Sequence, residues 1–173
     1  MPTYTFNEAD ARAAHEEWGC NCGPTALAFA LQVKLGAVRH AIPKFAERRY
    51  TSPTMMAAAL EFLQQPFTAV RAGLKHAGTN NAAAIDQMFR GPLTLVRIQW
   101  TGPWIVKGKP QRWAARQTHW IATWSERGVY LVFDVNGGIQ GLSRWEVETV
   151  PAIVATIKNA DGGWYPQNIW RLA

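Results

Sequence analysis

A cysteine near the N-terminus stands where it could act as a nucleophile. Cys22 lies in the stretch WGCNCGPTALAFAL, residues 18–31, and is followed by Gly23 and Pro24. Proline suits the first turn of a helix, because its missing N–H would have no partner there, and glycine leaves room beside the sulfur. The residues from Ala26 to Val33 are apolar on nearly every side, which predicts a buried helix that begins at Cys22 or Gly23. The positive pole of this helix would favour the thiolate, the reactive form of cysteine.

A thiolate nucleophile needs a base and a group that orients the base, and a predicted hairpin supplies both. The strand HWIATW begins with His119, and the strand VYLVFDV contains Asp134. The residues 125–128 between them, SERG, predict a hairpin turn. With the turn near Glu126 and Arg127, His119 is expected directly opposite Asp134, with both side chains on one face at the open end. Asn136 is expected on the same side and is the alternative orienting residue.

The stretches WGCNCGPTALA, THWIATW and VFDVNGG together resemble the papain-like cysteine peptidases, in particular the branch that includes the bacterial double-glycine leader peptidases. The resemblance implies an α+β fold in which a central nucleophile helix packs on a C-terminal antiparallel sheet. It also implies that Cys22 is the nucleophile, His119 the base and Asp134 the orienting residue. The activity implied is that of a thiol hydrolase, a cysteine peptidase or amidase whose substrate is a peptide or protein.

One position departs from the pattern of that family, which has a glutamine six residues before the nucleophile to stabilise the oxyanion. Here Glu16 stands at this position, and an ionised carboxylate repels a developing negative charge instead of donating to it. Four accounts follow. Glu16 is protonated; a shift of register brings His15 or another donor to the oxyanion; the backbone N–H of Cys22 acts with Gln117 or Asn21; or hydrolysis has been lost.

Two further classes of function stay open. The same triad could serve an acyltransferase, a deamidase or a transglutaminase, or the chain could be a non-catalytic binding module on the same fold, which Glu16 favours. Four tryptophans lie near the site residues in sequence and are candidate walls of a substrate groove: Trp18, Trp104, Trp113 and Trp120.

Composition predicts one domain over residues 1–173, with 48% hydrophobic residues to form its core. The N-terminus lacks the basic and apolar regions of a secretory signal, and no apolar run approaches the ~18 residues that span a bilayer. We therefore expect a cytoplasmic protein with no membrane partner. The net charge of +6 is scattered, too dilute to favour nucleic acid as a partner. The oligomeric state is left open.

The two cysteines, Cys20 and Cys22, are one residue apart, which is poor spacing for a disulfide and supplies only half of a zinc pairing. We therefore expect no metal, a structural role for Cys20, and no cofactor, because thiol hydrolysis requires none.

The elements that must position these residues change character along the chain, from helices to strands. Pattern and capping signals predict helices within residues 7–17, 22–33, 34–50 with a break at Pro43, 54–65 capped by Ser52, 80–92, and one opened by a Ser143–Glu146 capping box, and strands within 66–73, 93–100, 119–124, 129–135 and 160–173. The long loop 101–117 directly precedes His119 and is a candidate lid. Helices first and antiparallel strands second predict an α+β fold.

Overall fold

The computed structural model describes residues 9, 12, 15, 16, 22–48, 50–70, 82–105 and 117–173. Its helices are α2 (Cys22–Leu31), α3 (Leu35–Arg39), α4 (Phe45–Arg48), α5 (Pro53–Phe62), α6 (Ala82–Met88), α7 (Leu142–Arg144), the π-helical turn η2 (Trp145–Thr149) and α8 (Val150–Val154). Its strands are β1 (Phe67–Val70), β2 (Leu93–Trp100), β3 (Thr118–Glu126), β4 (Val129–Asp134), β5 (Gly138–Gly141) and β6 (Trp164–Leu172).

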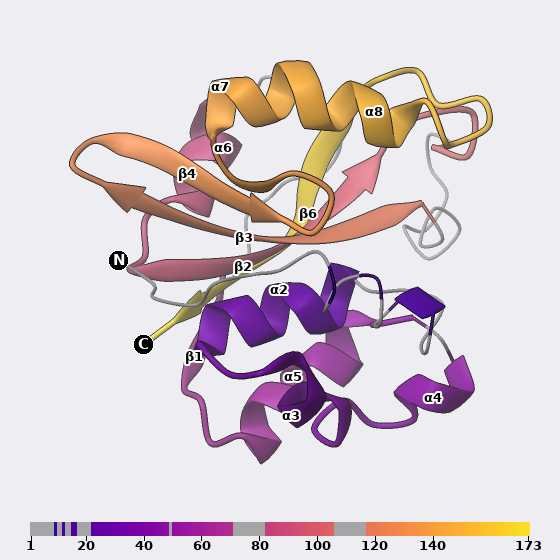
Figure 1. Ribbon diagram of the computed structural model, residues 1–173. Helices are drawn as coiled ribbons and strands as arrows, with labels where there is room; N and C mark the ends of the chain where they lie inside the picture. Colours follow the sequence, from indigo (N-terminus) through magenta and orange to yellow (C-terminus); the bar gives the residue numbers. More distant parts are fainter. Residues whose placement is uncertain are drawn as a thin grey trace.

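Helices cover both faces of one six-stranded antiparallel sheet of order β1-β6-β2-β3-β4-β5. The helices α2, α3 and α5 lie on one face, while α6, α7 and α8 lie on the other (Figure 1). The predicted α+β class is therefore confirmed. The last group of helices follows strands in the sequence, so the order of helices first and strands second holds only in outline.

The helix predicted from Cys22 or Gly23 to about Val33 is confirmed as α2, which begins at Cys22, ends at Leu31 and is buried from Gly23 to Ala30. Side chains that are apolar on every side allow it to pack between the sheet and the outer helices. Phe29, at the middle of its buried surface, stacks on Phe133 of β4 with ring centroids 4.0 Å apart. This contact anchors α2 across the β3–β4 hairpin.

The start of α5 is set by local chemistry that the sequence predicts. The Ser52 hydroxyl accepts a hydrogen bond from the Met55 backbone N–H at 3.2 Å, and Pro53 occupies the first turn. The preceding residue, Thr51, is held against the core because its carbonyl accepts a hydrogen bond from Trp120 Nε1 at 2.9 Å. Helix α5 is thereby fixed beside α2.

The predicted C-terminal strand is confirmed as β6, but its place in the sheet is not evident from the sequence. It lies between β1 and β2 and pairs with both. Strand β2 in turn lies between β6 and β3, and its residues from Thr94 to Trp100 are all buried. A strand with neighbours on both edges and helices on both faces has no solvent side, which explains its continuous burial.

The predicted register of the β3–β4 hairpin is wrong by two residues. The ladder pairs Ala122 with Phe133 and ends at Glu126 and Val129, so the turn is Arg127–Gly128. Both turn residues have positive φ, 50° and 79°, as in the tight turns that fit the twist of a hairpin. His119 is therefore not directly opposite Asp134. Because the error is an even number of residues, both side chains still emerge on the same face.

The predicted capping box is also wrong, although a helix does form there. Gly141 is the N-cap of α7, and Ser143 lies inside the helix. The short strand β5, which the sequence reading did not predict, ends at Gly141 and sets this start. The helix then widens into the π-helical turn η2 and continues as α8.

Candidate active site

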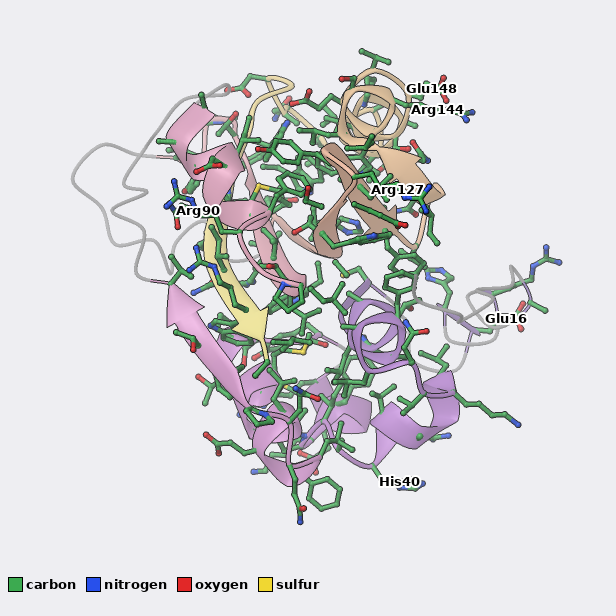
Figure 2. The ribbon with its side chains drawn as sticks, turned by 90° about the vertical axis from the view of Figure 1, so that its left-hand side faces the viewer. Glu16, His40, Arg90, Arg127, Arg144 and Glu148 are labelled. Atoms are coloured by element: carbon green, nitrogen blue, oxygen red, sulfur yellow. The ribbon has the colours of Figure 1, made fainter. Side chains whose placement is uncertain are left out.

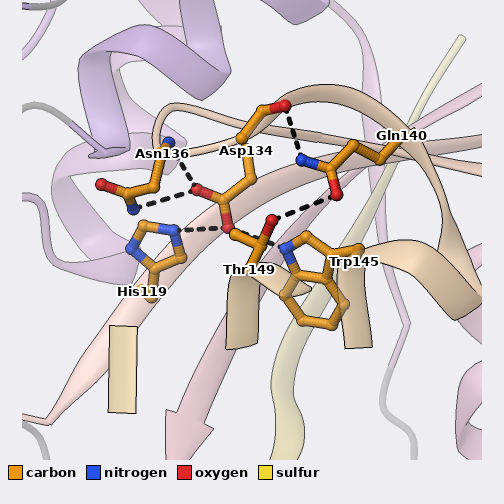
Figure 3. A network of polar contacts seen from close by, with 7 residues as sticks. His119, Asp134, Asn136, Gln140, Trp145 and Thr149 are labelled. Carbon is orange, nitrogen blue, oxygen red and sulfur yellow. Dashed lines mark hydrogen bonds and ion pairs between the residues drawn. The ribbon is translucent and has the colours of Figure 1, made fainter. Parts of the chain in front are cut away.

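The centre of the candidate site is a buried contact between the His119 imidazole and the Asp134 carboxylate, which is an ion pair when the imidazole is protonated. His119 Nε2 lies 3.0 Å from Asp134 Oδ2, with the histidine side chain 8% exposed and the aspartate 0% (Figure 3). His119 is the second residue of β3 and Asp134 the last residue of β4, so the pair sits where the two strands diverge. The structure thus brings together two of the three residues proposed for the triad.

Asp134 is held by donors on both carboxylate oxygens. Asn136 donates to Oδ1 from its backbone N–H at 2.9 Å and from its side-chain amide at 3.1 Å, while Trp145 Nε1 donates to Oδ2 at 2.8 Å. Burial by itself would raise the pKa of Asp134. The charge and hydrogen bond of His119, with the donors from Asn136 and Trp145, outweigh burial and hold this pKa below its ordinary value. Asn136, the alternative orienting residue, thus orients the carboxylate.

Trp145 reaches Asp134 from the π-helical turn, and the sequence analysis did not identify it. Its side chain is 0% exposed and packs edge-on against Trp164 at a centroid distance of 5.2 Å. A second set of contacts supports the same turn: Thr149 donates to Gln140 Oε1 at 3.1 Å, and Gln140 Nε2 donates to the Gly137 carbonyl at 2.5 Å (Figure 3). Widened turns often occur at functional sites. Only the tertiary structure brings this indole to the carboxylate, so no sequence signal would have found it.

His119 belongs to the face of the sheet that α2 does not cover. Its ring packs against Trp100 at a centroid distance of 6.1 Å, and Trp100 lies in the core beneath α6, α7 and α8. The neighbours of His119 in β3 point the other way, with Trp120 in the core beneath α2. At this end β3 pairs with β2 from Thr118 onward, whereas its ladder with β4 begins only at Ala122. One edge of β3 beside His119 is thus not covered by β4.

Cys22 is the first residue of α2, and its half-buried thiol packs against the core between α2 and the sheet. The first turn of α2 and the beginning of β3 lie toward the same end of the molecule, at the right in Figure 1. Helix α2 packs against β3, the strand that carries His119. The fold therefore directs the thiol end of the helix toward the end of the strand where the imidazole lies.

A second residue that the sequence did not single out is Arg97 of β2, whose guanidinium lies at the start of β3 on the face of the sheet that α2 covers. Arg97 is only 7% exposed, and its guanidinium donates to Gln167 Oε1 at 2.6 Å and to Thr118 Oγ1 at 3.0 Å. Burial lowers its pKa to about 10, and the nearby Cys22 acts in the opposite direction. A charged residue inside the apolar strand LTLVRIQW was a signal that could have been followed, because arginine is almost never fully buried without a partner.

Three further candidates for the oxyanion lie among the residues that the structure describes: His15, Glu16 and Gln117. Glu16 and His15 are exposed, and Glu16 points outward at the edge of the molecule (Figure 2). Neither exposed side chain supports the prediction that it stabilises the oxyanion. Gln117 is half-buried, and its carbonyl accepts from the Trp100 N–H at 2.9 Å and from Gln99 Nε2 at 2.8 Å.

The expected groove of tryptophans is corrected for Trp120, which is 2% exposed and packs against Trp170 in the core. Trp104 is half-buried, donates from Nε1 to the Trp100 carbonyl at 2.9 Å and packs against the core beneath α6, α7 and α8. Four residues named from the sequence lie outside the described residues: Trp18, Cys20, Asn21 and Trp113.

Among the residues that the structure describes, no three or more His, Cys, Asp and Glu side chains come together as a metal site would require. In the same part of the chain every helix is too short or too polar to span a bilayer. A scan of protein-family models gives no match to this chain, and a search of curated protein sequences gives none either.

Proposed function

We propose that the protein is a thiol hydrolase of papain-like fold that cleaves an amide bond with Cys22, His119 and Asp134. The observation that carries this proposal is the buried pair of His119 and Asp134, 3.0 Å apart, at the end of the strand on which α2 packs. The first residue of α2 is a cysteine. Nucleophile, base and orienting group are the three parts that such chemistry needs.

The orientation of the imidazole supports the assignment of roles. Nε2 faces Asp134, and Nδ1 lies on the other side of the ring, pointing away from the carboxylate (Figure 3). We propose that Nδ1 is the atom that accepts the proton of the Cys22 thiol. The thiol would approach past the edge of β3 near Thr118, where β4 does not pair.

The reaction then proceeds in two balanced steps. The Cys22 thiolate attacks the substrate carbonyl carbon, the C–N bond breaks, and His119 gives its proton to the departing amine, which leaves a thioester on the enzyme. Water attacks the thioester, His119 accepts the proton of the water, and the C–S bond breaks to release a carboxylic acid and the thiolate. Asp134 keeps the imidazole in one orientation and stabilises its charged form.

The oxyanion of each step needs hydrogen-bond donors. Glu16 is exposed, so we assign this role to the backbone N–H groups at the start of α2, which point out of the first helical turn. A weaker oxyanion site predicts a slow enzyme, because the loss of one donor costs about 10²–10³-fold in turnover.

The test measures the thiolate directly and requires no knowledge of the substrate. In a Cys20→Ser background Cys22 is the only thiol, and iodoacetamide converts its thiolate to a thioether with release of iodide. The pH dependence of this rate should show thiolate well below the value of about 8.5 for an ordinary cysteine. His119→Asn should move the profile toward that value, and the Cys20→Ser/Cys22→Ser protein should take up no label. An ordinary profile in the Cys20→Ser protein would contradict the proposal.

Hydrolysis itself is tested with a library of peptides, with products followed by mass spectrometry in the presence and absence of an added amine. Cleavage that is lost in Cys22→Ala supports a hydrolase. Transfer to the added amine would instead make the protein an acyltransferase that uses the same residues.

A further inference from the structure

A permanently charged side chain lies buried on the face of the sheet that α2 covers, and the mechanism above does not use it. Arg97 stands in the middle of β2, surrounded by apolar strand residues, with 7% of its surface exposed. Burying a cation costs free energy unless an anion or several hydrogen bonds compensate it. Such a group in a fold therefore needs an explanation.

The guanidinium is fixed in place by two neighbouring strands. The pairing of β2 with β6 shifts between Arg97 and Ile98, and this leaves Gln167 as an extra residue in β6. The Gln167 side chain accepts from Arg97 Nη1 at 2.6 Å, while Thr118 of β3 accepts from Nη2 at 3.0 Å. Thr118 directly precedes His119, so the guanidinium lies at the end of β3 where the proposed site is.

The partners of Arg97 on β3 and β6 are neutral oxygens, whereas α2 offers a group that can be an anion. A negative charge on Cys22 raises the pKa of Arg97 and so favours the charged guanidinium. This attraction is mutual, so the guanidinium favours the thiolate by the same interaction. Both Arg97 and Trp120, its partner in the ladder, point to the face that α2 covers.

Other titratable groups packed near this end of the sheet act differently. His119 and Asp134 form their pair on the opposite face. Tyr165 of β6 lies opposite Gln99, and burial raises the pKa of its phenol, so it is neutral near neutral pH. Arg97 is therefore the group in the described part of this region that keeps a positive charge when the imidazole loses its proton.

We propose that Arg97 is a positioning residue that stabilises the Cys22 thiolate as a second cation, alongside His119. This inference rests on the proposed function, since it concerns the state of the proposed nucleophile. It implies that the thiolate persists above the pH at which His119 becomes neutral, which a nucleophile paired only with imidazolium would not do.

The experiment compares alkylation by iodoacetamide in Cys20→Ser proteins that carry Arg97→Met, Arg97→Lys, His119→Asn, or both Arg97→Met and His119→Asn. We expect Arg97→Met to slow alkylation at about pH 6 by about tenfold, the effect of a shift of one pH unit in the profile. Arg97→Lys should retain most of the wild-type rate, because it keeps the charge while losing the forked geometry. His119→Asn should leave a profile still below that of an ordinary thiol, and the double variant should reach the ordinary profile.

The outcomes separate the two proposals. If His119→Asn alone gives an ordinary thiol profile, Arg97 has no such role and the proposed hydrolase stands. If Arg97→Met shifts the profile while His119→Asn does not, Arg97 is confirmed and the Cys-His pairing fails. An ordinary profile in the parent protein overturns both.

The same set of proteins is also tested for correct folding. Each variant is checked by circular dichroism and thermal unfolding, and a purely structural role would lower stability without moving the pH profile of the folded protein. Should Arg97→Met fail to fold, Thr118→Val takes its place, since it removes the acceptor of Nη2 and leaves the charge less well held beside the sulfur. An unchanged profile in Thr118→Val, together with an ordinary thiol profile in His119→Asn, overturns the inference.

Discussion

At the scale of single residues, the candidate site shows how a buried carboxylate can remain ionised. Asp134 is completely buried, yet each of its oxygens has donors: Asn136 at one, and His119 and Trp145 at the other. Desolvation is offset only because all of these groups point at the same carboxylate. Removing the negative charge should therefore be costly, because the donors would remain buried without their acceptor.

We predict that Asp134→Asn lowers the free energy of unfolding by about 3–5 kcal/mol near neutral pH, the cost of breaking a buried pair. Its lowered pKa means that Asp134 stabilises the native state above the unfolded value of about 4 and that this stabilisation is lost as pH falls through the lower native value. Urea titrations at a series of pH values should thus show the difference between variant and wild type shrinking in acid.

Asp86→Asn is the matched control for this variant. The Asp86 side chain is 39% exposed and pairs with Arg90 one turn further along, so its substitution should change stability by less than about 1 kcal/mol. An Asp134→Asn protein as stable as the control would mean that the pair does not stabilise the fold.

At the scale of elements, the π-helical turn η2 decides which side chain meets Asp134. The same turn carries Trp145, which is fully buried, and Val147, which is 71% exposed. Glu146 lies between them, and burial raises the pKa of its carboxyl. Substitutions at Trp145 and at Val147 can therefore be compared within one short turn, so that the difference in their effects comes from side-chain burial.

We predict that Trp145→Phe destabilises the protein by about 2–3 kcal/mol, because it removes a hydrogen bond to a buried charge and leaves a small cavity. It should also move the acid unfolding midpoint to higher pH, since one cause of the lowered pKa of Asp134 is lost. Val147→Ala should change stability by less than about 0.5 kcal/mol. Equal effects of the two substitutions in thermal and acid unfolding would contradict this role for the indole.

A second prediction at this scale concerns two glycines that differ only in backbone conformation. Gly128 in the β3–β4 turn has a φ of +79°, whereas Gly36 lies inside α3, and an added methyl group would meet nothing within 4 Å at either position. Gly128→Ala should therefore destabilise by about 1 kcal/mol through strain, and Gly36→Ala should stabilise by about 0.5–1 kcal/mol. Chemical denaturation of both variants measures the two signs, and a shared sign would contradict the argument.

Helix starts could be predicted from the sequence, whereas the register of the β3–β4 hairpin could not. Cys22, Gly23 and Pro24 determine the start of a helix through neighbouring residues, and α5 is determined likewise by its Ser52 cap, so both were predictable. The hairpin register was not, because Arg127 adopts a positive φ that its residue type does not suggest. The shared face of His119 and Asp134 survived the error because strand periodicity is two.

At the scale of the whole molecule, the sheet is assembled from segments distant in sequence. Strand β6, the last element, lies between β1 and β2, and the Arg97–Gln167 contact joins residues of β2 and β6. Partners 70 residues apart depend on topology rather than on neighbouring residues. Only coordinates could reveal them.

We predict that a chain ending at Gly163, which lacks β6, loses cooperative folding, because β1 then has no partner strand and one edge of β2 is uncovered. Circular dichroism during heating should show no sharp transition. Removing only Ala173 should cost less than about 1 kcal/mol, since it deletes weak exposed contacts with Gln65 and Pro66. A sharp transition in the longer truncation would show that the sheet does not depend on its central strand.

The central position of β6 also has a consequence for synthesis. A ribosome makes Cys22 well before Trp164–Leu172, so the nascent chain holds the thiol without the strand that completes the sheet until β6 has been made. Arg97 lacks its Gln167 acceptor throughout that time. The contacts that hold the guanidinium on the face of the sheet covered by α2 are therefore completed only after β6 has been synthesised.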